Sequence, residues 1–86
     1  MILEKLVTKY IDSTEHVLKN METAEKSVNI NEESIRKVVE YVEAYLEDAK
    51  YYRDKRKFEV SLASVAYCEG LLDALKLLGA LKVTSE

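Results

Sequence analysis

The feature that most restricts the fold of this 86-residue chain is its near lack of helix-breaking residues. The sequence has no proline and only two glycines, Gly70 and Gly79, among many alanines, leucines, glutamates and lysines. Proline and glycine interrupt helices most strongly, whereas the other four residue types are good helix formers. The chain is therefore predicted to be all α.

The first half of the sequence contains two segments with the spacing of an amphipathic helix. In the first segment, apolar side chains recur at alternating steps of four and three residues from Leu3 onward, which predicts a helix over residues 2–24. The same spacing returns from Ile35 to Tyr52 and predicts a second helix over residues 32–54. Asn31 directly precedes this helix and is a residue type that caps helix N-termini.

The apolar spacing loses its phase at RDKRK, residues 53–57, and resumes at Phe58. This break predicts a tight charged turn followed by a third helix over residues 57–78. Gly79 suits the left-handed position that ends a helix, and residues 80–86 are then a tail.

The third helix is apolar around most of its circumference. At 100° per residue, its charged side chains share one arc, roughly 100° wide; they are Glu59, Glu69, Asp73 and Lys76. Such a helix needs neighbours on more than one side. We therefore expect one domain, an up-down-up three-helix bundle with left-handed, heptad-like packing.

The bundle prediction also assigns individual residues to the core. Leu62 and Leu72 are expected to be buried, and Gly70 is expected to mark the close approach of another helix. Three tyrosines are expected to lie on core stripes, namely Tyr10, Tyr45 and Tyr52.

Charge and cysteine content exclude several classes of function. The chain has 13 basic and 16 acidic side chains and a net charge of −3, so it has no overall attraction for nucleic acid or an anionic membrane. Its single cysteine, Cys68, forms no internal disulfide, and no apolar run approaches the ~20 residues of a membrane span. These features lead us to expect a cytoplasmic protein.

No catalytic, cofactor-binding or metal-binding motif is present, so we expect a protein that is not an enzyme. Glu69 and Asp73 are four residues apart on one helix face, but with Lys76 they form an ordinary solvated stripe. His16 is near Asp12, yet zinc requires three or four ligands. We therefore predict no metal site and no cofactor.

Two surfaces remain as candidates. The apolar excess of the third helix predicts a surface for a protein partner or a second copy, with Tyr67, Leu71 and Leu77 as its residues. The alternative function is that of an accessory domain that binds nucleic acid or a nucleotide weakly, through a basic turn made of Arg53, Lys55, Arg56 and Lys57. The leading expectation is a self-associating helical interaction module.

The stretch AYLEDAKYYRDKRKFEVSLASVAYCEGLLDALKLLG, residues 44–79, resembles an archaeal family of short helical domains known as DUF357. The match is carried by LEDAKYY at the end of one helix and by the apolar residues and EGLLDAL of the next. This resemblance implies a compact three-helix bundle and implies no activity. A glycine is expected in the turn between the two helices, where this chain has DKRK.

Overall fold

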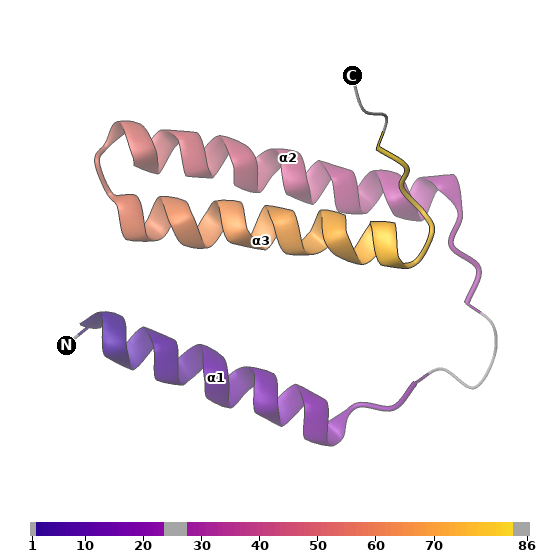
Figure 1. The fold of residues 1–86 in the computed structure, drawn as a ribbon, viewed down its shortest axis with the longest axis horizontal. Helices are drawn as coiled ribbons and strands as arrows, with labels where there is room; N and C mark the ends of the chain where they lie inside the picture. The colour runs from indigo at the N-terminus through magenta and orange to yellow at the C-terminus, as the bar shows by residue number, and fades with distance from the viewer. Residues whose placement is uncertain (1, 24–27, 84–86) are drawn as a thin grey trace.

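The computed structural model describes residues 2–23 and 28–83 and contains three helices. They are α1 (Ile2–Asn20), α2 (Glu32–Asp54) and α3 (Phe58–Leu77). In Figure 1, α1 and α3 run in the same direction and α2 runs in the opposite one. The described residues contain no strand, and the all-α prediction is confirmed.

The helix boundaries follow from local hydrogen bonds. α2 has the predicted bounds, because the Asn31 side chain accepts a hydrogen bond of 2.8 Å from the backbone N–H of Ser34. α1 ends at Asn20, earlier than predicted, and residues 21–23 are irregular, while residue 24 lies outside the described residues. The Asn20 side-chain amide donates a hydrogen bond of 2.8 Å to the His16 carbonyl, one turn earlier in the helix.

The turn between α2 and α3 is a Schellman motif with an arginine at its left-handed position. The backbone N–H of Arg56 donates to the Arg53 carbonyl at 3.0 Å, and that of Lys57 donates to the Tyr52 carbonyl at 2.8 Å. Arg56 has a φ of 61°, a conformation that glycine adopts far more readily than arginine. The chain thus forms the turn without the expected glycine.

α3 ends in the same motif, this time with glycine. Gly79 has a φ of 76° and donates to the Lys76 carbonyl at 3.0 Å, while Ala80 donates to the Leu75 carbonyl at 2.8 Å. The predicted role of Gly79 is confirmed.

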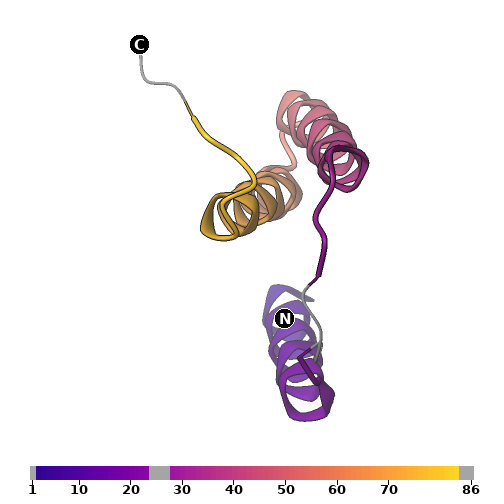
Figure 2. The ribbon, with the colours of Figure 1, turned by 90° about the vertical axis from the view of Figure 1, so that its right-hand side faces the viewer.

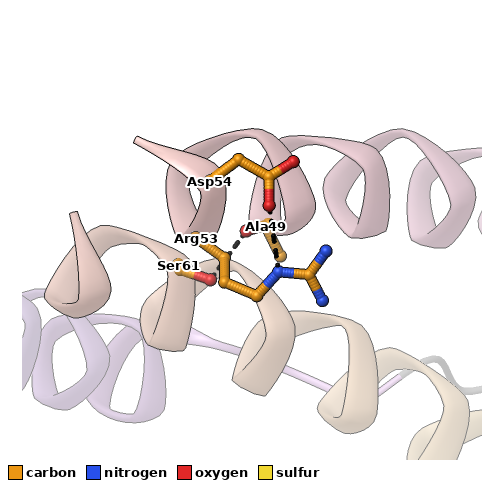
Figure 3. Close-up of polar contacts among 4 residues, drawn as sticks. All are labelled: Ala49, Arg53, Asp54 and Ser61. Carbon is orange, nitrogen blue, oxygen red and sulfur yellow. Dashed lines mark hydrogen bonds and ion pairs between the residues drawn. The ribbon is translucent and has the colours of Figure 1, made fainter. Parts of the chain in front are cut away.

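α2 and α3 pack side by side as an antiparallel hairpin (Figures 1 and 2). The buried side chains of the described residues all come from these two helices and are Val42, Ala49, Cys68 and Leu75. Two hydrogen bonds join α3 to backbone carbonyls of α2. Ser61 Oγ donates to the Ala49 carbonyl at 2.7 Å (Figure 3), and Cys68 Sγ donates to the Val42 carbonyl at 3.3 Å.

These two hydrogen bonds fix the register of the hairpin. Their α2 members, residues 42 and 49, are one heptad apart, and so are their α3 members, residues 61 and 68. Three of these four positions carry a small side chain, namely Ala49, Ser61 and Cys68, which lets two helix backbones approach closely. The two contacts are therefore separated by the same seven-residue interval on both helices.

α1 stands apart from this hairpin. It has no buried residue, and among the described residues α2 and α3 are the only helices in contact (Figure 2). The radius of gyration is 15.7 Å, compared with about 12 Å for a compact chain of this length. The first helix is formed as predicted, but it does not close onto the other two.

The open arrangement corrects several core predictions. Leu62 is 68% exposed, since it lies about 120° around α3 from the buried Cys68. Leu72 and Tyr52 are half-buried, whereas Tyr10 and Tyr45 are exposed. A Cβ added to Gly70 would meet no atom within 4 Å, so the predicted close approach at this glycine is wrong.

Candidate interaction surface

A groove of about 530 Å³ separates α1 from the hairpin. One wall is Tyr10 of α1, and the other wall belongs to α2 and α3. The residues that line it, hereafter the groove, are Tyr10, Tyr45, Val60, Ala63, Ser64 and Tyr67. Its lining is almost entirely apolar or aromatic, which is typical of a surface that receives another apolar element.

An aromatic pair joins the two helices on the hairpin side of the groove. The rings of Tyr45 and Tyr67 are 4.7 Å apart between centroids and meet edge to face at 75°. Tyr67 remains 50% exposed and Tyr45 36% exposed. The two rings offer a partner a large apolar surface, and their hydroxyl groups can stay in contact with water.

α3 contributes a row of side chains to the groove side of the hairpin. This row is separate from the side of α3 that is buried against α2. The row has the spacing of three and four residues expected for one side of a helix. Its members are Val60, Ala63, Tyr67, Leu71, Ala74 and Leu78. Of these, Tyr67, Val60 and Leu78 are 44–65% exposed, and Leu71 is half-buried.

The structure therefore brings together two of the three predicted partner residues. Tyr67 and Leu71 share the row, whereas Leu77 lies about 80° around the helix from Tyr67. Leu77 is 89% exposed, and neither Leu77 nor Leu71 lines the groove. Sequence reasoning missed Val60 and Ala63, although their spacing from Tyr67 was a signal that could have identified them.

The apolar side of α1 is also uncovered. Its large apolar side chains are all at least 42% exposed. They form a continuous surface, hereafter the α1 stripe, made of Leu3, Leu6, Val7, Tyr10, Ile11, Val17 and Leu18. Among the described residues near the chain ends, Ile2 is 80% exposed and Val83 is 65% exposed, whereas Leu81 is half-buried.

The four predicted basic residues gather at the turn, but they are not four free charges. Arg53 Nε lies 3.3 Å from the carboxylate of Asp54 (Figure 3). The Lys55 ammonium lies 5.6 Å from the Tyr51 ring, and the Arg56 guanidinium lies 5.6 Å from the Phe58 ring. These distances allow weak cation–π attraction at an exposed site.

The charged side chains of Glu69, Asp73 and Lys76 on α3 are exposed, as predicted. Lys76 Nζ lies 3.7 Å from Asp73 Oδ1, and both side chains are about half exposed or more. His16 is exposed on α1, and Asn20 Nδ2 lies 3.4 Å from its ring Nδ1. Within residues 2–23 and 28–83, no three potential ligands come together in a way that would hold a metal ion.

None of the helices in those ranges combines the length and the apolar character needed to cross a bilayer.

A comparison with curated proteins found no match, and neither did a comparison with solved structures. A family model described as "Protein of unknown function (DUF357)" matches residues 9–81, a range that includes the hairpin, its turn and most of α1. The chain belongs to the DUF357 family.

Proposed function

We propose that this protein is a non-enzymatic helical interaction module that associates with a second copy of itself. The observation that carries this proposal is the amount of surface left open. The chain exposes 8011 Å², about 2,800 Å² more than the roughly 5,200 Å² expected for a compact monomer of its mass. The exposed residues include the large apolar side chains of the groove and the α1 stripe, which association would remove from water.

The absence of catalytic chemistry in the sequence supports a binding role. The single cysteine is 4% exposed, and the single histidine lies on a solvated helix face. The groove is lined by aromatic and aliphatic side chains, with Ser64 as its one small polar residue apart from the tyrosine hydroxyls. Such a lining favours contact with an apolar protein surface over the activation of a substrate.

Tyr67→Glu tests the proposal because it places a charge in the groove. We expect the native chain to have a dimer mass by light scattering and this variant to dissociate at least tenfold more readily. Tyr51→Glu is the matched control, since Tyr51 is 56% exposed and lies outside the groove. A helical circular dichroism spectrum must be retained in both variants. If the two variants dimerised equally well, the groove would not be part of the interface.

We propose a role in nucleic-acid binding as the second candidate. It is supported by the exposed aromatic rings beside Lys55 and Arg56, because base stacking and backbone charge are the two elements of single-strand recognition. The net charge of −3 and the Arg53–Asp54 ion pair weigh against strong binding.

A further inference from the structure

We infer that two copies of this chain pair by exchange, with α1 of each copy docked in the groove of the other copy's hairpin. This inference rests on the proposed self-association and adds to it the identity of the two surfaces that meet. Each chain carries both surfaces, the α1 stripe and the hairpin wall of the groove, and neither is covered within the chain. The hairpin wall consists of Tyr45, Val60, Ala63, Ser64 and Tyr67. Two different surfaces on one chain can pair reciprocally about a two-fold axis and so close the assembly.

The two surfaces match in length and in spacing. α1 has 19 residues and α3 has 20, which correspond to about 28 Å and 30 Å. Leu3, Val7 and Tyr10 begin a series of steps of four and three residues, and Val60, Ala63 and Tyr67 follow the same steps. Ridges with this spacing on one helix fit the grooves between ridges of another.

The connection between α1 and the hairpin is long enough for exchange. It runs over residues 21–31, whereas neighbouring helices in bundles are usually joined by about 2–8 residues. A connection of this length can bring α1 to its own hairpin or to that of a neighbouring chain, so the surfaces decide which pairing forms. Swapping an identical element is a low-cost route to a dimer.

The area available is sufficient for a homodimer. The excess of about 2,800 Å² per chain amounts to about 5,600 Å² for two chains, within the upper range of obligate homodimer interfaces. The Tyr45–Tyr67 pair would lie at the centre of each docking site, where a buried aromatic anchor contributes most to binding.

Disulfide trapping distinguishes exchange from other arrangements. One chain carries Tyr10→Cys and a second carries Ala63→Cys, two positions that line the same groove on opposite walls. The two chains are unfolded together, refolded as a mixture and oxidised. Tyr10→Cys mixed with Glu47→Cys is the control, because Glu47 is exposed and lies outside the groove. Native Cys68 is buried and present in every sample.

We expect a two-chain disulfide product in the first mixture at a yield at least tenfold above that of the control. The inference is overturned if the first mixture gives no such product and the double variant Tyr10→Cys/Ala63→Cys forms its disulfide within a single chain, because α1 then docks on its own hairpin. A dimer mass with no disulfide between these positions also overturns exchange, while leaving self-association in place. A monomer at every concentration overturns both.

Discussion

Ser61 Oγ donates a hydrogen bond of 2.7 Å to the carbonyl of Ala49, and this contact joins α3 to α2. The donor is half-buried, and its acceptor belongs to Ala49, one of the four buried residues in the described part of the chain. The contact requires a small side chain on each helix. The register of the hairpin therefore depends on the residue types at positions 49 and 61.

Ser61→Ala should therefore destabilise the protein by about 0.5–1.5 kcal/mol, the usual net contribution of one hydrogen bond. The Ala49 carbonyl keeps its place inside α2, so no buried acceptor is left without a partner. Chemical denaturation measures the change. Ser64→Ala is the matched control, because Ser64 is half-buried on the same helix and makes no hydrogen bond to the described residues through its hydroxyl. Equal losses for the two variants would contradict the assigned role of Ser61.

Arg56→Gly should stabilise the protein by up to about 1 kcal/mol. A left-handed conformation is strained by about 1–2 kcal/mol for a residue with a Cβ, and part of this gain is offset by the greater freedom of glycine in the unfolded chain. Thermal unfolding provides the measurement. Lys55→Gly is the control, since Lys55 has a φ of −85° and gains nothing from glycine. Destabilisation by both substitutions would show that Arg56 is not strained.

Leu75→Ala should reduce the free energy of unfolding by about 2–5 kcal/mol, because Leu75 is 5% exposed near the C-terminal end of α3. Leu62→Ala, on the same helix, should change it by less than about 0.5 kcal/mol, because Leu62 is 68% exposed. Urea titration of the two variants makes the comparison. A loss at Leu62 similar to that at Leu75 would mean that another surface covers Leu62.

Binding of single-stranded RNA at the basic turn should be weak and should fall steeply with salt, because the turn can neutralise only a few phosphates. Reversing both Arg56 and Lys57 to glutamate should abolish it, as measured by fluorescence anisotropy with a labelled oligonucleotide. Reversing Lys5 and Lys9 of α1 provides a control with the same change in charge. RNA binding that survives the first double variant would exclude the turn as the binding site.

The helices were predictable because their signals are local. Asn31 and the spacing that follows it define α2, and the positive φ of Gly79 follows from its place after the last apolar residue of α3. The sequence predicts only a tight turn around Arg56 and not a Schellman motif, because arginine rarely adopts the left-handed conformation that the motif requires.

The surfaces were less predictable, because apolar spacing shows that a helix has an apolar side and does not show what covers it. Tyr67 and Leu71 were assigned to a partner surface from the apolar excess of α3, and the structure places them on one row. Leu62 was assigned to the core for the same reason, yet it faces away from α2. The hydrogen bonds of Ser61 and Cys68 determine which side of α3 faces α2, and the apolar spacing alone does not show this.

Sedimentation equilibrium of the unmodified chain, from low to high micromolar concentration, tests the central claim most directly. If the open apolar surfaces are covered by a second copy, the measured mass should approach twice the 9.9 kDa of one chain and should fall on dilution. A folded chain that remains at 9.9 kDa at the highest concentration would contradict self-association.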